Sequence, residues 1–144
     1  MIGPRPWRLL TVCLGNHCRS PLAAAVLARR GGPAVEVRSA GIRDKWTGEP
    51  AHPAMVNAAA ARGYDLSAHR GRPVNRALLE WADVVLAMDA GNLAALHRLA
   101  DPRILPKLGL YLGNRDVPDP WGQEGEAFAH VAALIDDGAA RHLP

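Results

Sequence analysis

Residues 13–21 read Cys-Leu-Gly-Asn-His-Cys-Arg-Ser-Pro, and their side chains could bind an oxyanion and attack it. A cysteine reacts as its thiolate, and backbone N–H groups together with Arg19 would stabilise the thiolate of Cys13. The planar guanidinium of Arg19 can bind two oxygens of a tetrahedral anion at once. Ser20 places a hydroxyl where it could donate to the sulfur when the cysteine becomes a leaving group. These residue types predict a nucleophilic reaction on a bound anion.

The elements around this stretch must hold it as a loop between a strand and a helix. An apolar run at residues 9–12 predicts a buried strand, and the composition of residues 22–30 predicts a helix. Ser20 suits the N-cap of that helix, and Pro21 suits its first position because the N–H it lacks would have no partner there. Backbone N–H groups at a helix N-terminus bind anions.

Two residues in the loop suit the strained backbone that such an anion site requires. Gly15 is free of a Cβ, and Asn16 tolerates a left-handed conformation. We therefore expect the whole loop to bind phosphate, through Leu14, Gly15, Asn16, His17, Cys18, Arg19 and Ser20.

Residues 13–21 resemble the signature of the low-molecular-weight protein tyrosine phosphatases, a small cytoplasmic α/β family that also includes thiol-dependent arsenate reductases and arginine phosphatases. The resemblance extends from about Leu9 to the last predicted helix. It implies that Cys13 attacks phosphorus, that Arg19 holds the phosphoryl group, and that no metal or cofactor is required. The expected substrate is a phosphorylated protein or peptide, with phosphotyrosine as the first choice.

Residues 116–122, Asp-Val-Pro-Asp-Pro-Trp-Gly, form a second candidate for chemistry. The phenol released from phosphotyrosine has a pKa of about 10, so a carboxylic acid that protonates it would speed its departure by about 10²- to 10⁴-fold. The same carboxylate could then deprotonate the water that hydrolyses the cysteinyl-phosphate. The resemblance assigns this role to Asp119 rather than Asp116. An Asp-Pro pair is also common in turns, so the residues alone leave a structural role open.

Aromatic and histidine side chains could shape the cleft. Trp46 either stacks on a flat substrate group or packs beneath its loop, and Trp121 could form a second wall where many relatives have tyrosines. The resemblance implies that His69 hydrogen-bonds the nucleophile loop near Asn16. His52 stands where many relatives have an acidic residue, which would alter the charge of the cleft.

The remaining patterns predict a single α/β domain, residues 1–144, with three layers and a four-stranded, mainly parallel central sheet flanked by helices. Asp89 could cap the helix that follows the third strand and lies at the edge where ligands bind. The expected strands span residues 9–12, 34–39 and 82–88, with a weak fourth at 104–108. The expected helices span residues 22–30, 53–62, 75–81, 90–99 and 124–141.

Composition narrows the function classes. The chain has 144 residues, 49% of them hydrophobic, and a net charge of +3 with few aromatics, which disfavours a nucleic-acid partner. No signal peptide or membrane-spanning segment is apparent, so we expect a cytoplasmic protein without a membrane partner. We expect it to be a monomer or weak dimer. Cys13, His17 and Cys18 are too few for a structural zinc site. Cys18 could instead trap oxidised Cys13 as a reversible disulfide.

His17 leaves the substrate open. The resemblance places it on the cleft floor, where tyrosine phosphatases have an aliphatic residue and arginine phosphatases a threonine. Three alternatives to a tyrosine phosphatase follow: a protein arginine phosphatase, an arsenate reductase that uses an external thiol, and a non-catalytic phosphate-binding module.

Overall fold

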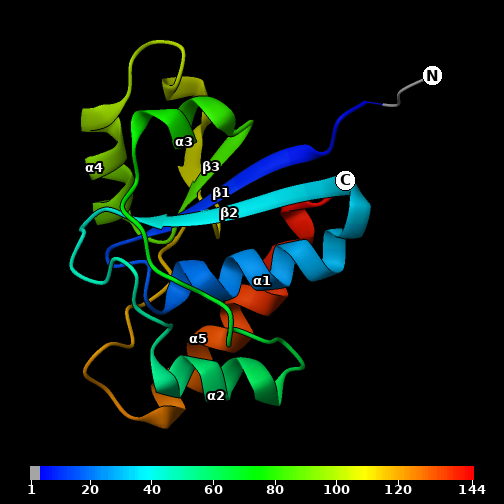
Figure 1. Cartoon of the computed structure of the whole chain (residues 1–144), viewed down its shortest axis with the longest axis vertical. Coiled ribbons are helices and arrows are strands. Elements are labelled where there is room, and N and C mark those ends of the chain that lie inside the picture. Colours follow the sequence, from blue (N-terminus) through cyan, green and yellow to red (C-terminus); the bar gives the residue numbers. More distant parts are fainter. Residues whose placement is uncertain (1–3) are drawn as a thin grey trace.

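Strand β1, Trp7–Cys13, runs through the middle of the sheet and leads directly into the loop of residues 14–18. The computed structural model describes residues 4–144, where the strand order is β2-β1-β3-β4 and every neighbouring pair is parallel. The other strands are β2 (Val35–Gly41), β3 (Val84–Ala87) and β4 (Leu108–Leu110). The predicted α/β fold with four strands is confirmed, and the sheet is parallel throughout. All four carboxyl ends therefore meet at one edge, on the left of Figure 1.

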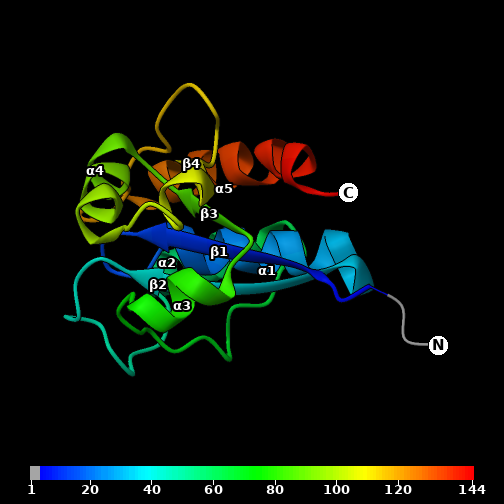
Figure 2. The same cartoon turned by 90° about the horizontal axis from the view of Figure 1, so that it is seen from above.

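Helices cover both faces of this sheet, which gives the three predicted layers. Figures 1 and 2 show α1, α2 and α5 on one face and α3 and α4 on the other. None of the helices in residues 4–144 is long and apolar enough to cross a membrane. The bounds are α1 Arg19–Gly31, α2 Pro53–Ala61, α3 Arg76–Trp81, α4 Ala90–Leu99 and α5 Gly125–Gly138, with 3-10 turns at Gly32–Ala34, Leu105–Lys107 and Ala139–His142.

Alternation along β1 separates two apolar cores. Leu9 packs into the core beneath α1, α2 and α5, whereas Leu10 and Val12 pack into the core beneath α3 and α4. Successive side chains of a strand point to opposite faces of its sheet, so a central strand covered on both faces must be apolar throughout. This packing holds the end of β1, and with it Cys13, in a fixed place.

The start of α1 differs from the prediction. The helix begins at Arg19 with Cys18 as its N-cap residue and without a side-chain capping bond. The Ser20 hydroxyl is instead directed into the loop, where it contacts the Cys13 sulfur and accepts a hydrogen bond from Asn16. Pro21 is tolerated at the third helical position because the N–H groups of the first turn have no partner within the helix.

The predicted fourth strand at residues 104–108 is wrong in its position. Leu105–Lys107 forms a 3-10 turn and β4 follows at Leu108–Leu110. Pro106 has no N–H for the ladder, and its fixed φ suits the start of a helical turn. The predicted terminal helix at 124–141 is α5 followed by a 3-10 turn, and its apolar face is buried through Phe128, Val131 and Ile135.

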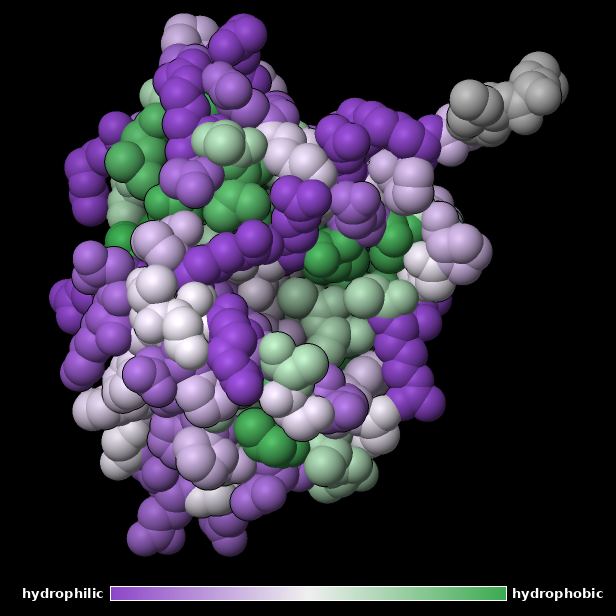
Figure 3. All heavy atoms as spheres, in the orientation of Figure 1, coloured by the Kyte–Doolittle hydropathy of each residue, from purple (hydrophilic) through white to green (hydrophobic). Residues whose placement is uncertain are grey.

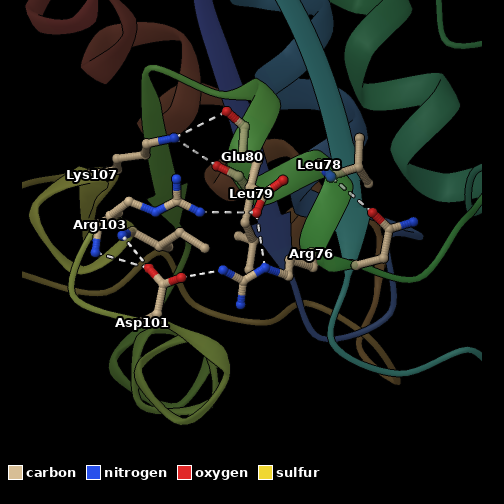
Figure 4. A network of polar contacts seen from close by, with 9 residues as sticks. Arg76, Leu78, Leu79, Glu80, Asp101, Arg103 and Lys107 are labelled. Carbon is tan, nitrogen blue, oxygen red and sulfur yellow. Dashed lines mark hydrogen bonds and ion pairs between the residues drawn. The ribbon is translucent and has the colours of Figure 1, made fainter.

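Polar contacts fasten α3 to the chain that precedes β4, as Figure 4 shows. Lys107 Nζ donates to the backbone oxygens of Leu79 and Glu80, 3.0 and 3.1 Å away, and so satisfies carbonyls at the end of α3. Arg76 pairs with both Glu80 and Asp101.

On the face drawn in Figure 3, apolar side chains lie in separate patches among hydrophilic residues.

Candidate active site

A cleft of about 150 Å³ opens at the carboxyl end of β1 and brings Cys13, Arg19 and Asp119 together. Cys13 is the last residue of β1, Arg19 is the first residue of α1, and Asp119 lies in the distant segment between β4 and α5. The side chains of Asn16 and Ser20 are buried, and these two residues do not line the cleft. The lining consists of Cys13, Leu14, Gly15, His17, Cys18, Arg19, Arg43, Lys45, Trp46, Asp119 and Trp121.

The backbone of residues 14–18 is arranged as an anion site. None of its five N–H groups donates a hydrogen bond to another group in the described part of the chain. Three of its carbonyls, in contrast, accept hydrogen bonds from outside the loop: Leu14 O from the N–H of Arg43 at 2.8 Å, His17 O from the N–H of His52 at 2.9 Å, and Asn16 O from His69. Because these carbonyls have partners and the N–H groups are free, the loop offers a set of donors to a bound anion.

Asn16 fixes the shape of this loop. It is the one non-glycine residue with positive φ in residues 4–144, at 54°, and its side chain is 1% exposed. Its Nδ2 donates to the hydroxyls of Ser20 and Ser39 at 2.8 and 2.9 Å, and its Oδ1 accepts from the N–H of Arg72 at 3.0 Å. Nε2 of His69 lies 2.8 Å from the Asn16 carbonyl, so this nitrogen carries the ring proton and donates it. His69 thus lies where the family resemblance implies.

Cys13 immediately precedes the loop, and its sulfur lies 3.1 Å from the Ser20 hydroxyl. Asn16 donates to that hydroxyl oxygen, so the hydroxyl proton can go to the sulfur or to the carbonyl of Ala40, which lies farther away at 3.4 Å. The second thiol, Cys18, is also buried, and burial together with the nearby Cys13 raises its pKa to about 12. Both thiols are free. The disulfide between them stays a prediction.

Arg19 is held from the side opposite the loop. Its side chain is 2% exposed, and Nη1 donates to Asp89 Oδ2 at 2.7 Å and to the carbonyl of Val117 at 2.8 Å. The other carboxylate oxygen of Asp89 accepts from the N–H of Asn92 at 2.7 Å and caps α4, as predicted. Asp89 therefore caps a helix and also orients the buried guanidinium, and only the first of these functions has a local sequence signal.

The two candidate acids of the loop before α5 occupy different places. Asp119 lines the cleft, with Oδ2 3.6 Å from Nη2 of Arg19, and its side chain is 44% exposed. Asp116 lies outside the cleft, where Oδ1 accepts from the N–H of Ala90 at 2.9 Å. A general acid must reach the leaving group, so the geometry favours Asp119.

The cleft has a flat aromatic wall. The rings of His17 and Trp46 stack with centroids 4.0 Å apart and an interplanar angle of 3°. Burial, and then the charge of His52, lowers the pKa of His17, which favours a neutral ring. Trp121, 53% exposed, borders the mouth of the cleft, and Lys45 Nζ lies 5.0 and 5.6 Å from the Trp46 and Trp121 rings.

Sequence reasoning misplaced one residue here and missed two. His52 does not line the cleft: its Nδ1 accepts from the N–H of Ala54 and caps α2, and its ring packs against His17 and Phe128. The missed residues are the exposed cations Arg43 and Lys45. The sequence feature that could have identified them is their position just after the second strand, at the edge where open sheets bind ligands. Within residues 4–144, no group of three or more His, Cys, Asp or Glu side chains could hold a metal ion.

Comparison with known proteins agrees with this geometry. Residues 8–143 match the family described as low molecular weight phosphotyrosine protein phosphatase. The chain is 33% identical over 131 residues to the low molecular weight protein-tyrosine-phosphatase Etp of Escherichia coli K12, covering 89% of this chain and 86% of Etp. Its fold is similar to Vibrio vulnificus Wzb solved in complex with benzylphosphonate, with a TM-score of 0.88, 33% identity and coverage of 94% and 96%. It is also similar to the YwlE arginine phosphatase of Geobacillus stearothermophilus, with a TM-score of 0.86, 30% identity and coverage of 95% and 90%.

Proposed function

This chain belongs to the low molecular weight phosphotyrosine protein phosphatase family and is a protein-tyrosine-phosphatase, and from that premise we propose which of its residues carry the reaction. Cys13 is the nucleophile, Arg19 and the N–H groups of residues 14–18 hold the phosphoryl group, and Asp119 is the general acid. The observation that carries this proposal is the set of free N–H groups in the loop that follows Cys13, at a cleft that Cys13, Arg19 and Asp119 line together.

The first step transfers the phosphoryl group to sulfur. The thiolate of Cys13 attacks phosphorus, a sulfur–phosphorus bond forms, and the bond from phosphorus to the phenolic oxygen breaks. The electron pair of the broken bond passes to the phenolic oxygen, which takes a proton from Asp119. The negative charge that develops on the transferred oxygens is stabilised by the N–H donors of residues 14–18, which have no other partner among the described residues.

The second step regenerates the enzyme. Asp119, now a carboxylate, accepts a proton from water as the water oxygen attacks phosphorus, and the bond between sulfur and phosphorus breaks. The electron pair returns to the Cys13 sulfur, where the Ser20 hydroxyl 3.1 Å away can donate to the leaving thiolate. Inorganic phosphate then leaves the loop.

The aromatic wall supports a phenyl leaving group. The stacked rings of His17 and Trp46 form a flat surface beside the loop, and the ring of a phosphotyrosine can lie against such a surface. The similarity to the YwlE arginine phosphatase favours phosphoarginine as a second candidate. Kinetics on matched peptides that carry phosphotyrosine or phosphoarginine separate the two, and we expect kcat/KM to be higher for phosphotyrosine.

The residue assignment is tested by steady-state hydrolysis of aryl phosphates whose leaving groups differ in pKa. Cys13→Ser should have no measurable turnover. Asp119→Ala should lower kcat/KM, which reports the first step, by about 10²- to 10⁴-fold for poor leaving groups and less for para-nitrophenyl phosphate, whose leaving group needs less protonation. Asp116→Ala is the matched control from the same loop and should retain activity. Substantial turnover by Cys13→Ser, or equal losses in the two aspartate variants, would overturn the assignment.

A further inference from the structure

A second cavity adjoins the cleft, and its residues on α4 have no part in the reaction above. It is a groove of about 420 Å³ that follows α4 from Gly91 to Arg98, and it shares Leu14, Arg19, Arg43 and Asp119 with the cleft. Taking the proposed function as given, we propose that this groove binds an acidic side chain that neighbours the phosphotyrosine in the substrate, and that Arg43 and Arg98 recognise its carboxylate.

The charges of the groove are arranged for an anion. Its two carboxylates, Asp89 and Asp119, both face Arg19, at 2.7 and 3.6 Å. Arg43 and Arg98 are exposed, and neither forms an ion pair with any side chain in residues 4–144. No carboxylate within the described residues neutralises the guanidinium groups of Arg43 and Arg98. Because the N–H donors of a guanidinium are planar and match the two oxygens of a carboxylate, a carboxylate is the ligand that suits them.

A buried amide in the groove provides an independent observation. Asn92 is 3% exposed, and its Oδ1 is sealed from solvent without a hydrogen-bond partner among the described residues. Buried amide oxygens without a partner are rare, because leaving one unpaired costs free energy. No hydrogen bond within the described part of the chain fixes this side-chain amide, which lines the groove, so it is free to turn and present Oδ1 or Nδ2 to the backbone of a bound peptide.

Continuity of the two cavities connects this groove to the substrate. Arg43 lines both cavities, so a peptide whose phosphotyrosine occupies the cleft can follow the surface past Arg43 towards Arg98. An extended peptide advances about 3.3–3.6 Å per residue, so a side chain close in sequence to the phosphotyrosine can reach the groove. One end of the groove, at Gly91 and Asn92, lies at the N-terminal turn of α4, where the helix dipole favours negative charge, and Arg98 lies in the last turn of the same helix.

The test compares kcat/KM among phosphotyrosine peptides in which one glutamate is moved through the positions on either side of the phosphotyrosine, each with a glutamine counterpart. Para-nitrophenyl phosphate, which is too small to reach the groove, reports on the reaction itself. Arg98→Gln removes one charge from the groove and leaves the residues of the cleft intact. Arg103→Gln is the matched control, because Arg103 pairs with Glu80 and lines neither cavity (Figure 4).

For the wild-type protein, we expect glutamate to raise kcat/KM by about three- to ten-fold over glutamine at one or two neighbouring positions, as two partly exposed ion pairs would. Arg98→Gln should reduce that preference by about two- to five-fold, Arg103→Gln should leave it unchanged, and added salt should weaken it. Turnover of para-nitrophenyl phosphate should stay the same in both variants.

Three results would overturn the inference: no preference at any position, a preference that survives Arg98→Gln, or an equal loss on para-nitrophenyl phosphate. The first two leave the proposed function standing, because the small substrate is still hydrolysed. Failure of the wild-type protein on every phosphotyrosine substrate would instead overturn the proposed function.

Discussion

Replacement of Asn16 by alanine should be among the most damaging single changes at this site. The alanine loses three hydrogen bonds, to the hydroxyls of Ser20 and Ser39 and from the N–H of Arg72. Each contributes about 1 kcal/mol, and a positive φ costs alanine about 1–2 kcal/mol more. The sum is a loss of about 4–5 kcal/mol in the free energy of unfolding, a large part of the roughly 5–15 kcal/mol of a typical domain.

Urea denaturation of the wild type and two variants measures the contributions separately. Asn16→Gly loses the same three hydrogen bonds but adopts the 54° φ without strain, so it should be about 1 kcal/mol less destabilising than Asn16→Ala. Ser39→Ala removes one of the three partners and should cost about 1 kcal/mol. Both Asn16 variants should also have a lower kcat/KM for aryl phosphates, since the loop loses its internal support.

A loss of less than about 1 kcal/mol in the free energy of unfolding of Asn16→Ala would refute this prediction, because the three side-chain hydrogen bonds would then contribute almost nothing. A lower stability of Asn16→Gly than of Asn16→Ala would refute it as well. In that case the backbone conformation at this position would not limit the choice of residue.

Three further predictions concern the same loop and its surroundings. Ser20→Ala removes the hydroxyl that lies 3.1 Å from the Cys13 sulfur and can stabilise its thiolate. The reaction of Cys13 with iodoacetate near neutral pH should therefore slow by about ten-fold. An unchanged rate would show that the hydroxyl does not stabilise the thiolate. Gly41→Ala would place a Cβ 2.8 Å from the backbone nitrogen of Asn16, an atom that cannot rotate away. Urea denaturation should therefore show a loss of about 1–3 kcal/mol in the free energy of unfolding. Wild-type stability in this variant would mean that β2 and the loop can separate at no cost. Burial lowers the pKa of His17, His69 and His142 below the 6.5 of an unfolded chain. As the pH falls through 6.5 the unfolded chain therefore binds more protons than the folded protein, and the free energy of unfolding decreases. The urea midpoint should be lower at about pH 5.5 than at about pH 7.5, and an equal or higher midpoint at pH 5.5 would contradict this prediction.

Local sequence patterns determined the layout of the chain. The apolar residues of β1 must be covered on both faces, Asn75 and Asp89 accept from the first turns of the helices that they cap, and the order of strand, loop and helix places Cys13 at an anion site. One error arose where a side chain had competing partners outside the helix that it was predicted to cap. Ser20 did not cap α1 because its hydroxyl has Asn16 and the Cys13 sulfur as partners.

The sequence by itself determined the types of the reacting groups, because nucleophile, anion-binding arginine and acid are each defined by their own chemistry and by the residues next to them. Only the tertiary structure decided how these groups are oriented. Arg19 meets Asp89 and the Val117 carbonyl, and Asp119 rather than Asp116 reaches the cleft, through contacts between segments 70 or more residues apart in the chain. Local propensity carries no information about such pairs, since the packing of helices on the sheet brings them within hydrogen-bond distance.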